Sequence, residues 1–293
     1  MFSLVAPGLF PRLEGFNETY RKPVEKNGKT DVLGRLRARI RPFMLRRTKR
    51  EVVRELPEKV EQITRLELTP AHRRRYDQHL TRERTRVLGM LDDMDRNRVA
   101  IFRALTKLRQ LALDPRLVDT ELPPTPSAKI TTLLEQIREL AEEGHRALVF
   151  SSFTGFLKLV REALDAEGIE YVYLDGRTRD RPARIAQFRE GDAPVFLISL
   201  KAGGFGLTLT EADYVFVLDP WWNPAAENQA VDRAHRIGQT RAVNVYRMVS
   251  ADTIEEKVVA LQQRKRDLFA SVIDTGEFRS TTITASDIRG LLE

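Results

Sequence analysis

The chain has 293 residues, of which 42% are hydrophobic and 31% are charged, and its net charge is +7. This length suffices for one large domain or two smaller ones with hydrophobic cores, and the composition excludes an intrinsically disordered protein. Cysteine is absent and no apolar run reaches about 18 residues, which excludes disulfides, thiolate-bound zinc and a membrane-spanning helix.

The first 120 residues are predicted to be mainly helical. Helical spacing is present at 33–41 and again at 71–91, where Thr69 and Pro70 provide a cap and a first turn. Between these helices, alternation of apolar and polar residues predicts one strand at 60–68.

The same segment is strongly basic. Residues 1–120 hold 28 basic and 16 acidic residues, a net charge of +12, whereas residues 121–293 carry a net charge of −5. Of the 49 basic residues 38 are arginines, whose planar guanidinium suits phosphate. The asymmetry favours a polyanionic partner, and a general preference for arginine on solvated helix faces is the alternative.

A proline-rich linker at 121–128 ends the helical region, and strands then alternate with helices. Strands are predicted at 147–150, 169–174, 195–199, 214–218 and 243–249, and helices at 156–164, 181–188, 225–235 and 254–269. Strands separated by crossover helices predict an α/β fold with a parallel sheet. In such a sheet, ligands are expected at the loops that follow the carboxyl ends of the strands.

The first unusual loop, SLKAGGFGLT at 199–208, follows a predicted strand and holds three glycines in four positions. Glycine lets the backbone approach a ligand closely and turn its N–H groups toward an anion. Phosphate contact is one interpretation, and a flexible turn that binds nothing is the other. The G-x-x-x-x-G-K-[ST] spacing of a nucleotide phosphate loop occurs nowhere in the sequence.

A second loop, DPWWNP at 219–224, contains both tryptophans of the chain. Two adjacent aromatic rings held between prolines do not both bury well in one core. One ring is expected to face a ligand or partner, such as a nucleic-acid backbone or groove. A hydrophobic plug over the start of a helix is the alternative.

The third loop spans 229–239 and carries Gln229, Arg233 and Arg236. These residues are four and three positions apart, so a helix would place them along one face. Two guanidinium groups there suit the negative charge on a transferring γ-phosphoryl group. The alternative is an ordinary surface ion pair with Asp232 or Glu227.

Taken in this order, the loops resemble the second motor lobe of the SWI/SNF-type ATPases, helicase relatives that translocate on double-stranded DNA without separating its strands. The matching segments are VFSSFT at 149–154, YLDGRT at 173–178, KAGGFGLTLT at 201–210, DPWWNP at 219–224 and DRAHRIGQ at 232–239. Upstream, RPFMLRRTK at 41–49 and ELPEK at 55–59 resemble the family's inter-lobe brace, and 70–115 resembles its helical protrusion.

The resemblance implies a RecA-like parallel sheet flanked by helices, preceded by a mainly helical brace and protrusion region. It divides the chain into the tail of a first lobe with the brace (1–59), the protrusion (60–120), the linker (121–128), the RecA-like second lobe (129–275) and a C-terminal tail (276–293).

The resemblance also implies roles for single residues. Arg233 and Arg236 resemble the arginine fingers, and the nucleotide-binding residues are Gln229, Gly204 and Asp232. The residues implied to contact DNA are Ser152, Thr154, Arg177, Lys201, Gly203, Thr208 and Trp222, and no metal ligand is implied. Two positions depart from the family's pattern: Thr208 stands where Asn is usual, and Arg177, where Ser or Thr is usual, offers an added phosphate contact.

The family's phosphate loop and Mg²⁺-binding acidic motif lie in its first lobe, and neither occurs in this sequence. The chain is therefore expected to be the C-terminal part of a larger ATPase, with ATP and Mg²⁺ bound mainly by the first lobe, and to be inactive alone. The expected partners are double-stranded DNA, the N-terminal motor lobe of the same protein and a DNA-bound complex such as a polymerase, with no membrane.

Two other function classes stay open. A strand-separating RNA or DNA helicase lobe shares the fold, although its motif VI usually has a glycine–arginine repeat. The other is a non-catalytic module that binds DNA or a protein partner. The abundance of arginine and the absence of cysteine favour a bacterial or archaeal member, located in the cytoplasm and associated with the nucleoid.

Overall fold

The computed structural model describes residues 6–10, 12–21, 23, 30–43, 56–123, 127–202, 208–222, 224–263 and 284–293. The chain divides into two compact units, 1–54 with 261–284, and 55–260 with 285–293. Most of the predicted brace, the centre of the glycine loop with Gly203 and Gly204, and the second half of the predicted helix at 254–269 lie outside the described residues.

The first unit contains helix α4 (Thr30–Ile40), which confirms the helix predicted at 33–41. A shorter helix, α2 (Leu13–Phe16), continues directly into a π-helical turn. An aromatic cluster with ring centroids 5.3–5.7 Å apart forms beside it, made of Phe10, Phe16 and Tyr20. Arg39 of α4 donates a hydrogen bond to the Tyr20 hydroxyl at 2.9 Å, which joins the two helices.

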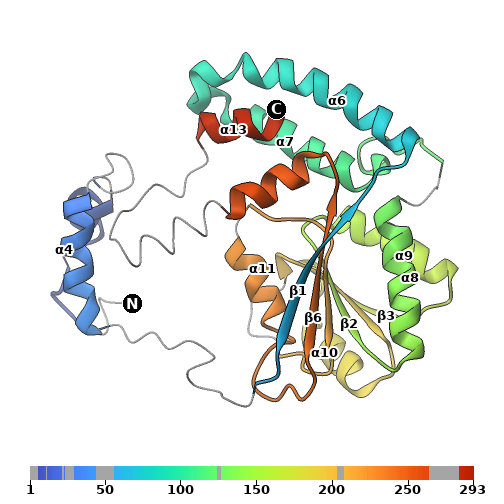
Figure 1. The fold of residues 1–293 in the computed structure, drawn as a ribbon. Coiled ribbons are helices and arrows are strands. Elements are labelled where there is room, and N and C mark those ends of the chain that lie inside the picture. Colours follow the sequence, from blue (N-terminus) through green and yellow to red (C-terminus); the bar gives the residue numbers. More distant parts are fainter. Residues whose placement is uncertain are drawn as a thin grey trace. The chain divides into compact units, whose positions relative to one another are not determined.

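The second unit is built on a six-stranded sheet in the order β1-β6-β5-β2-β4-β3, in which every pairing is parallel (Figure 1). The strands are β1 (Lys59–Leu66), β2 (Ala147–Ser151), β3 (Tyr171–Leu174), β4 (Val195–Ser199), β5 (Tyr214–Val217) and β6 (Val243–Ser250). All six were predicted, and the parallel sheet confirms the expected fold class. Strand β1 pairs with β6 along its whole length, so the segment predicted as the protrusion begins with an edge strand of this sheet.

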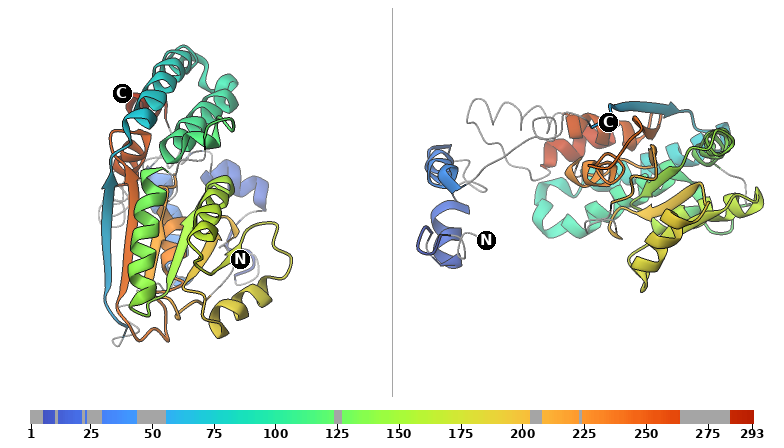
Figure 2. Two further views of the ribbon diagram at one scale, coloured as in Figure 1. Left: turned by 90° about the vertical axis from the view of Figure 1, so that its right-hand side faces the viewer. Right: turned by 90° about the horizontal axis from the view of Figure 1, so that it is seen from below.

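Helices cover both faces of the sheet (Figures 1 and 2). They are α8 (Ala128–Glu142) and α9 (Thr154–Ala166) on one face, and α10 (Arg181–Glu190) and α11 (Pro224–Val231) on the other. In β2, Val149 packs with the α8 and α9 core, while Leu148 and Phe150 pack with the core that Phe188 of α10 joins. Because both faces are buried, the central strands are apolar throughout, with no polar alternation.

A helical layer lies over the carboxyl ends of the strands (Figures 1 and 2). It consists of α6 (Pro70–Leu88), α7 (Met94–Leu113) and α13 (Ala285–Leu292). The predicted cap of α6 is confirmed, since the Thr69 side chain accepts a hydrogen bond from the His72 N–H and Pro70 stands in the first turn. Helix α6 is joined to the turn after β6, because the buried Tyr76 hydroxyl accepts a hydrogen bond from the Ile254 N–H at 2.7 Å.

No helix in the described part of the chain combines the length and apolar character that crossing a membrane requires.

Candidate functional site

The predicted site residues lie at opposite ends of the strands. Those that follow the carboxyl ends of β2, β3, β4 and β5 are Ser152, Thr154, Arg177, Lys201 and Trp222. Arg233 lies at the amino ends, because its carbonyl accepts a hydrogen bond from the Leu209 N–H, ahead of β5, at 3.0 Å. The expectation that all three loops gather at the carboxyl ends is therefore wrong for the third loop, which closes a crossover connection and returns the chain to the start of β6.

The helical face predicted for the third loop is also wrong. Helix α11 ends at Val231, and residues 232–238 form turns and a bend. The backbone changes there to hydrogen bonds three residues apart, as from the Ala234 N–H to the Val231 carbonyl at 3.1 Å. The loop turns away at Gly238, whose φ of 101° favours glycine.

The buried amide of Gln239 holds this loop in place. Its Nε2 donates to the carbonyls of Ala212 at 2.9 Å, Thr210 at 3.1 Å and Ala234 at 3.2 Å. Its Oε1 accepts hydrogen bonds from the next two backbone N–H groups, each at 2.9 Å. One side chain thus fixes the turn that contains Arg236 against the segment that precedes β5.

Arg233 is 5% exposed, and its Nε and Nη1 atoms are buried without a hydrogen-bond partner in the part of the chain that the structure describes. Burial, and then the positive charge of Arg236, lower the pKa of the Arg233 guanidinium. Arg236 is exposed. A buried cation with two unpaired donor nitrogens and an exposed cation close by suit an anionic ligand.

Glu227, one of the alternative ion-pair partners considered for these arginines, pairs with a different residue. Its Oε2 accepts a hydrogen bond from Arg247 Nε at 3.3 Å, and its Oε1 accepts one from the Trp221 N–H. Arg247, on β6, also pairs with Glu61 of β1. The carboxylate therefore stabilises the junction of α11, β6 and β1.

Three further predicted residues that the structure describes, Gln229, Asp232 and Thr208, lie around this end of the sheet. Gln229 is exposed on α11 and Asp232 is half-buried in the turns. The carbonyl of Thr208, predicted to contact DNA, accepts a hydrogen bond from Arg189 of α10, and the next residue pairs with Arg233. The structure thus places Thr208 with Arg233 and apart from Ser152.

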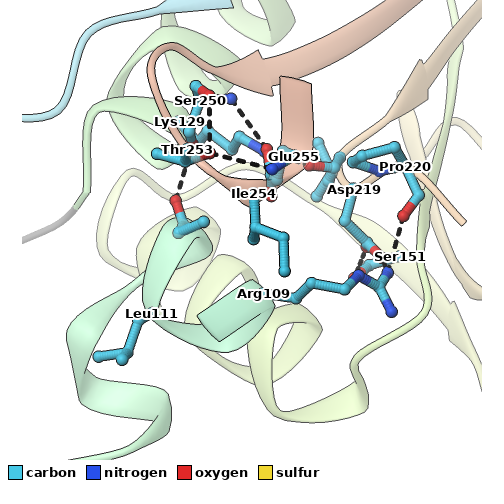
Figure 3. Close-up of polar contacts among 12 residues, drawn as sticks. Arg109, Leu111, Lys129, Ser151, Asp219, Pro220, Ser250, Thr253, Ile254 and Glu255 are labelled. Carbon is cyan, nitrogen blue, oxygen red and sulfur yellow. Dashed lines mark hydrogen bonds and ion pairs between the residues drawn. The ribbon is translucent and has the colours of Figure 1, made fainter. Parts of the chain in front are cut away.

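At the carboxyl ends, the centre of the site is Asp219, which is fully buried. Its Oδ1 accepts a hydrogen bond from the Ser151 hydroxyl at 2.6 Å (Figure 3). The same oxygen accepts one from the Ser152 N–H at 2.9 Å. Its Oδ2 accepts from Arg109 Nη2 at 3.0 Å and from the Ser152 hydroxyl. The Ser152 hydroxyl, predicted to touch a DNA phosphate, thus has a partner within the protein.

Arg109 of α7 is the residue that sequence reasoning missed. It is 2% exposed, and its Nη2 donates to Asp219 and to the Pro220 carbonyl at 2.8 Å (Figure 3). Burial lowers the pKa of this guanidinium, and the Asp219 carboxylate opposes that effect. The signal was present in the sequence, since Arg109 stands in the apolar stripe of α7 between Leu105 and Ala112.

Cations and aromatic rings surround this centre. The guanidinium carbon of Arg109 lies 4.9 Å from the ring centroid of Phe153, 5.2 Å from that of Trp221 and 5.3 Å from that of Trp222. Lys201 Nζ lies 5.9 Å from the Trp221 ring. Cations within about 6 Å of a ring face are attracted by its quadrupole. Two of the predicted DNA residues, Lys201 and Trp222, therefore belong to one cation–aromatic cluster.

Thr154, which follows β2, and Arg177, which follows β3, are both exposed. Arg177 stands in a turn in which Asp175 Oδ1 accepts the N–H groups of Arg177 at 2.8 Å and Thr178 at 3.1 Å. Burial raises the pKa of Asp175, but these hydrogen bonds outweigh it and leave the pKa below its ordinary value. The Asp175 carboxylate therefore holds the turn that carries Arg177.

The described residues contain no group of histidine, aspartate and glutamate side chains suited to holding a metal ion. The arginine pair suits the phosphate part of a nucleotide.

This fold, with a cationic loop at one end of a parallel sheet and a cation–aromatic cluster at the other, defines a RecA-like lobe of the helicase type. A family profile described as "SNF2-related domain" matches residues 1–117, and one described as "Helicase conserved C-terminal domain" matches 128–238. The chain belongs to the SNF2-related, SWI/SNF-type family of helicase-like ATPases, which confirms the resemblance drawn from its motifs.

Relatives come from bacteria, archaea and eukaryotes. A Mycoplasma pneumoniae protein described as an uncharacterized ATP-dependent helicase is 37% identical over 96% of this chain and 27% of its own length. Subunit snf21 of the Schizosaccharomyces pombe chromatin structure-remodeling complex is 32% identical over 95% of this chain and 25% of its own length. The Sulfolobus solfataricus SWI2/SNF2 ATPase core, solved with dsDNA, has a TM-score of 0.65 and 30% identity over 99% of this chain and 62% of that one. The chain thus spans between about a fifth and a third of the length of the curated relatives it matches.

Proposed function

We propose that this chain supplies the second motor lobe of an ATP-dependent translocase on double-stranded DNA. Arg233 and Arg236 act as arginine fingers on ATP, and Gln229, Gly204 and Asp232 lie beside the nucleotide. The phosphate loop and the ligands of Mg²⁺ come from a first lobe, so this chain alone neither holds ATP tightly nor hydrolyses it.

Two nitrogens of the Arg233 guanidinium, which have no hydrogen-bond partner among the described residues, carry this proposal. Buried polar atoms without a partner are rare because each costs about 1–3 kcal/mol, and more where the group is charged. The γ-phosphate of ATP offers the charge and the acceptor oxygens that Arg233 Nε and Nη1 lack. An arginine on a stabilised loop, held by Gln239, meets that phosphate with little reorganisation.

DNA lies, in this proposal, at the opposite end of the strands. Arg177, Lys201 and Trp222 supply cations and an aromatic ring for the phosphate backbone, and Thr154 with the glycine loop adds polar contacts. Contacts to phosphate carry no base information, so binding is sequence-tolerant and falls with salt. Since one rigid sheet separates the two sites, closure of the lobes on ATP moves the DNA-contacting end as one body.

The test is ATP hydrolysis stimulated by double-stranded DNA, measured for this chain, for the upstream lobe and for the two joined. We expect activity only in the joined protein. Hydrolysis by this chain alone would show that it holds a complete ATP site and would overturn the split assignment. Lack of activity in all three, with salt-sensitive DNA binding retained, would support the non-catalytic binding module.

We also propose that the motor acts on a DNA-bound complex such as a polymerase and that it is associated with the nucleoid.

A further inference from the structure

The two tryptophans stand in a loop that buried charges hold from two sides. On one side the Trp221 N–H donates to Glu227, which is 1% exposed and pairs with Arg247. On the other side the ion pair of Arg109 and Asp219 is buried at 2% and 0% exposure. Both tryptophans are themselves only half-buried. The loop is therefore fixed at its base while its rings keep surface for a partner.

Arg109 differs from the other anchors because it comes from the helical layer. It lies on α7, 110 residues before Asp219 and 43 before Ser152, and its Nη2 lies within hydrogen-bond distance of both side chains. Its guanidinium also lies against three aromatic rings. One side chain thus joins α7 to the segment after β2 and to the tryptophan loop after β5.

We propose that Arg109 is a positioning residue for the tryptophan loop and, through that loop, sets the affinity and ATPase response of the motor for double-stranded DNA. The helical layer is then a working part of the DNA-binding end. The DNA part of this inference rests on the proposed function, whereas the part about the loop does not.

A simpler role would be neutralisation of Asp219, since a buried carboxylate needs a counter-charge. The two roles separate in a double variant. The double variant Arg109→Met with Asp219→Asn removes both charges, so that no unpaired charge is buried. It does not restore the planar cation beside the aromatic rings. If Arg109 only neutralises Asp219, the double variant should recover thermal stability, tryptophan emission and DNA affinity. If Arg109 positions the loop, the double variant should recover thermal stability only.

The experiment uses this chain, whose only tryptophans are the two in the loop, so that tryptophan emission reports the loop alone. Emission maximum, acrylamide quenching, thermal unfolding and affinity for a short DNA duplex are measured for the wild type, Arg109→Met, the double variant and Arg103→Met. Arg103 is exposed on the same helix and provides the matched control. The joined two-lobe protein then gives the ratio of DNA-stimulated to basal hydrolysis.

We expect red-shifted, more quenchable emission and roughly three- to tenfold weaker duplex binding in the double variant, at wild-type thermal stability. The control should match the wild type. If the double variant recovers emission and DNA affinity together with stability, the positioning role is wrong. If the single variant Arg109→Met does not fold, the emission and DNA affinity of the double variant still distinguish positioning from neutralisation. If the wild type shows no salt-sensitive DNA binding, the proposed function fails, and the emission data still test the loop.

Discussion

At the scale of single residues, the arginines of this lobe differ in whether they have partners. Arg247 and Arg109 are each paired with a buried carboxylate, at 3.3 Å and 3.0 Å respectively. Arg233 is as buried as they are, yet two of its nitrogens have no hydrogen-bond partner among the described residues. Arg109 Nε also lacks a hydrogen-bond partner among the described residues, but Arg109 has a carboxylate beside it. A buried arginine that has no carboxylate partner in the described part of the chain points to a ligand.

Arg236, the exposed cation close to Arg233, provides the sharpest prediction at the scale of residues. Arg236→Ala in the joined two-lobe protein should lower DNA-stimulated ATP turnover by roughly 10³–10⁵, the usual range for an arginine finger. Duplex affinity should change little, because Arg236 lies at the amino ends of the strands. Steady-state hydrolysis and a binding titration measure both, with Arg103→Ala as control. Turnover within about tenfold of the wild type would reject the finger assignment.

At the scale of elements, the sequence predicted what depends on local pattern. Central strands such as β2 and β4 were visible because each is a short run of apolar residues, whereas β1 was visible from alternation of apolar and polar residues. The cap of α6 was visible because Thr69 and Pro70 stand at the start of that helix. The end of α11 was not predicted, because residue spacing alone does not reveal where backbone hydrogen bonds change from i→i−4 to i→i−3. Arg109 was missed for another reason: its partner Asp219 lies 110 residues away, and only the fold brings them together.

The contact between α6 and α7 makes a prediction about pH. His72 is 5% exposed, and its Nε2 lies 2.6 Å from the Leu111 carbonyl oxygen, so the neutral ring donates a hydrogen bond there. Burial lowers the pKa of His72 below 6.5. The unfolded chain therefore takes up a proton at higher pH than the folded chain. The stabilisation is complete above pH 6.5 and is lost as the pH falls through that value toward the folded pKa.

Urea unfolding at neutral pH and at about pH 5.5 tests this sign. The wild type should lose stability on acidification, and His72→Gln should lose less. At neutral pH the variant should be less stable by about 1–2 kcal/mol, because the fit of the ring to Leu111 is lost. Identical pH slopes for the wild type and His72→Gln would show that another group controls the acid response.

At the scale of the whole molecule, the compact unit at 55–260 combines a helical region with an α/β region, and the sheet joins them. Strand β1 comes from the first region and pairs with β6 of the second, while the helical layer covers the carboxyl ends where the predicted DNA residues gather. Residues 70–113 of that layer hold 11 basic and 5 acidic residues, so this positive charge lies over the end of the sheet that the proposal assigns to DNA.

Salt titration of duplex binding tests this arrangement with the chain alone. For double-stranded DNA the logarithm of affinity falls with the logarithm of salt by about 0.9 for each phosphate neutralised. Arg177→Ala and Lys201→Ala should therefore each lower the slope by about 0.9 and weaken binding to unrelated sequences equally. Lys158→Ala provides the control, because Lys158 is an exposed cation of α9 that pairs with Glu162. An unchanged slope in Arg177→Ala and Lys201→Ala, or an equal loss in Lys158→Ala, would show that the attraction comes from net charge rather than from these two contacts.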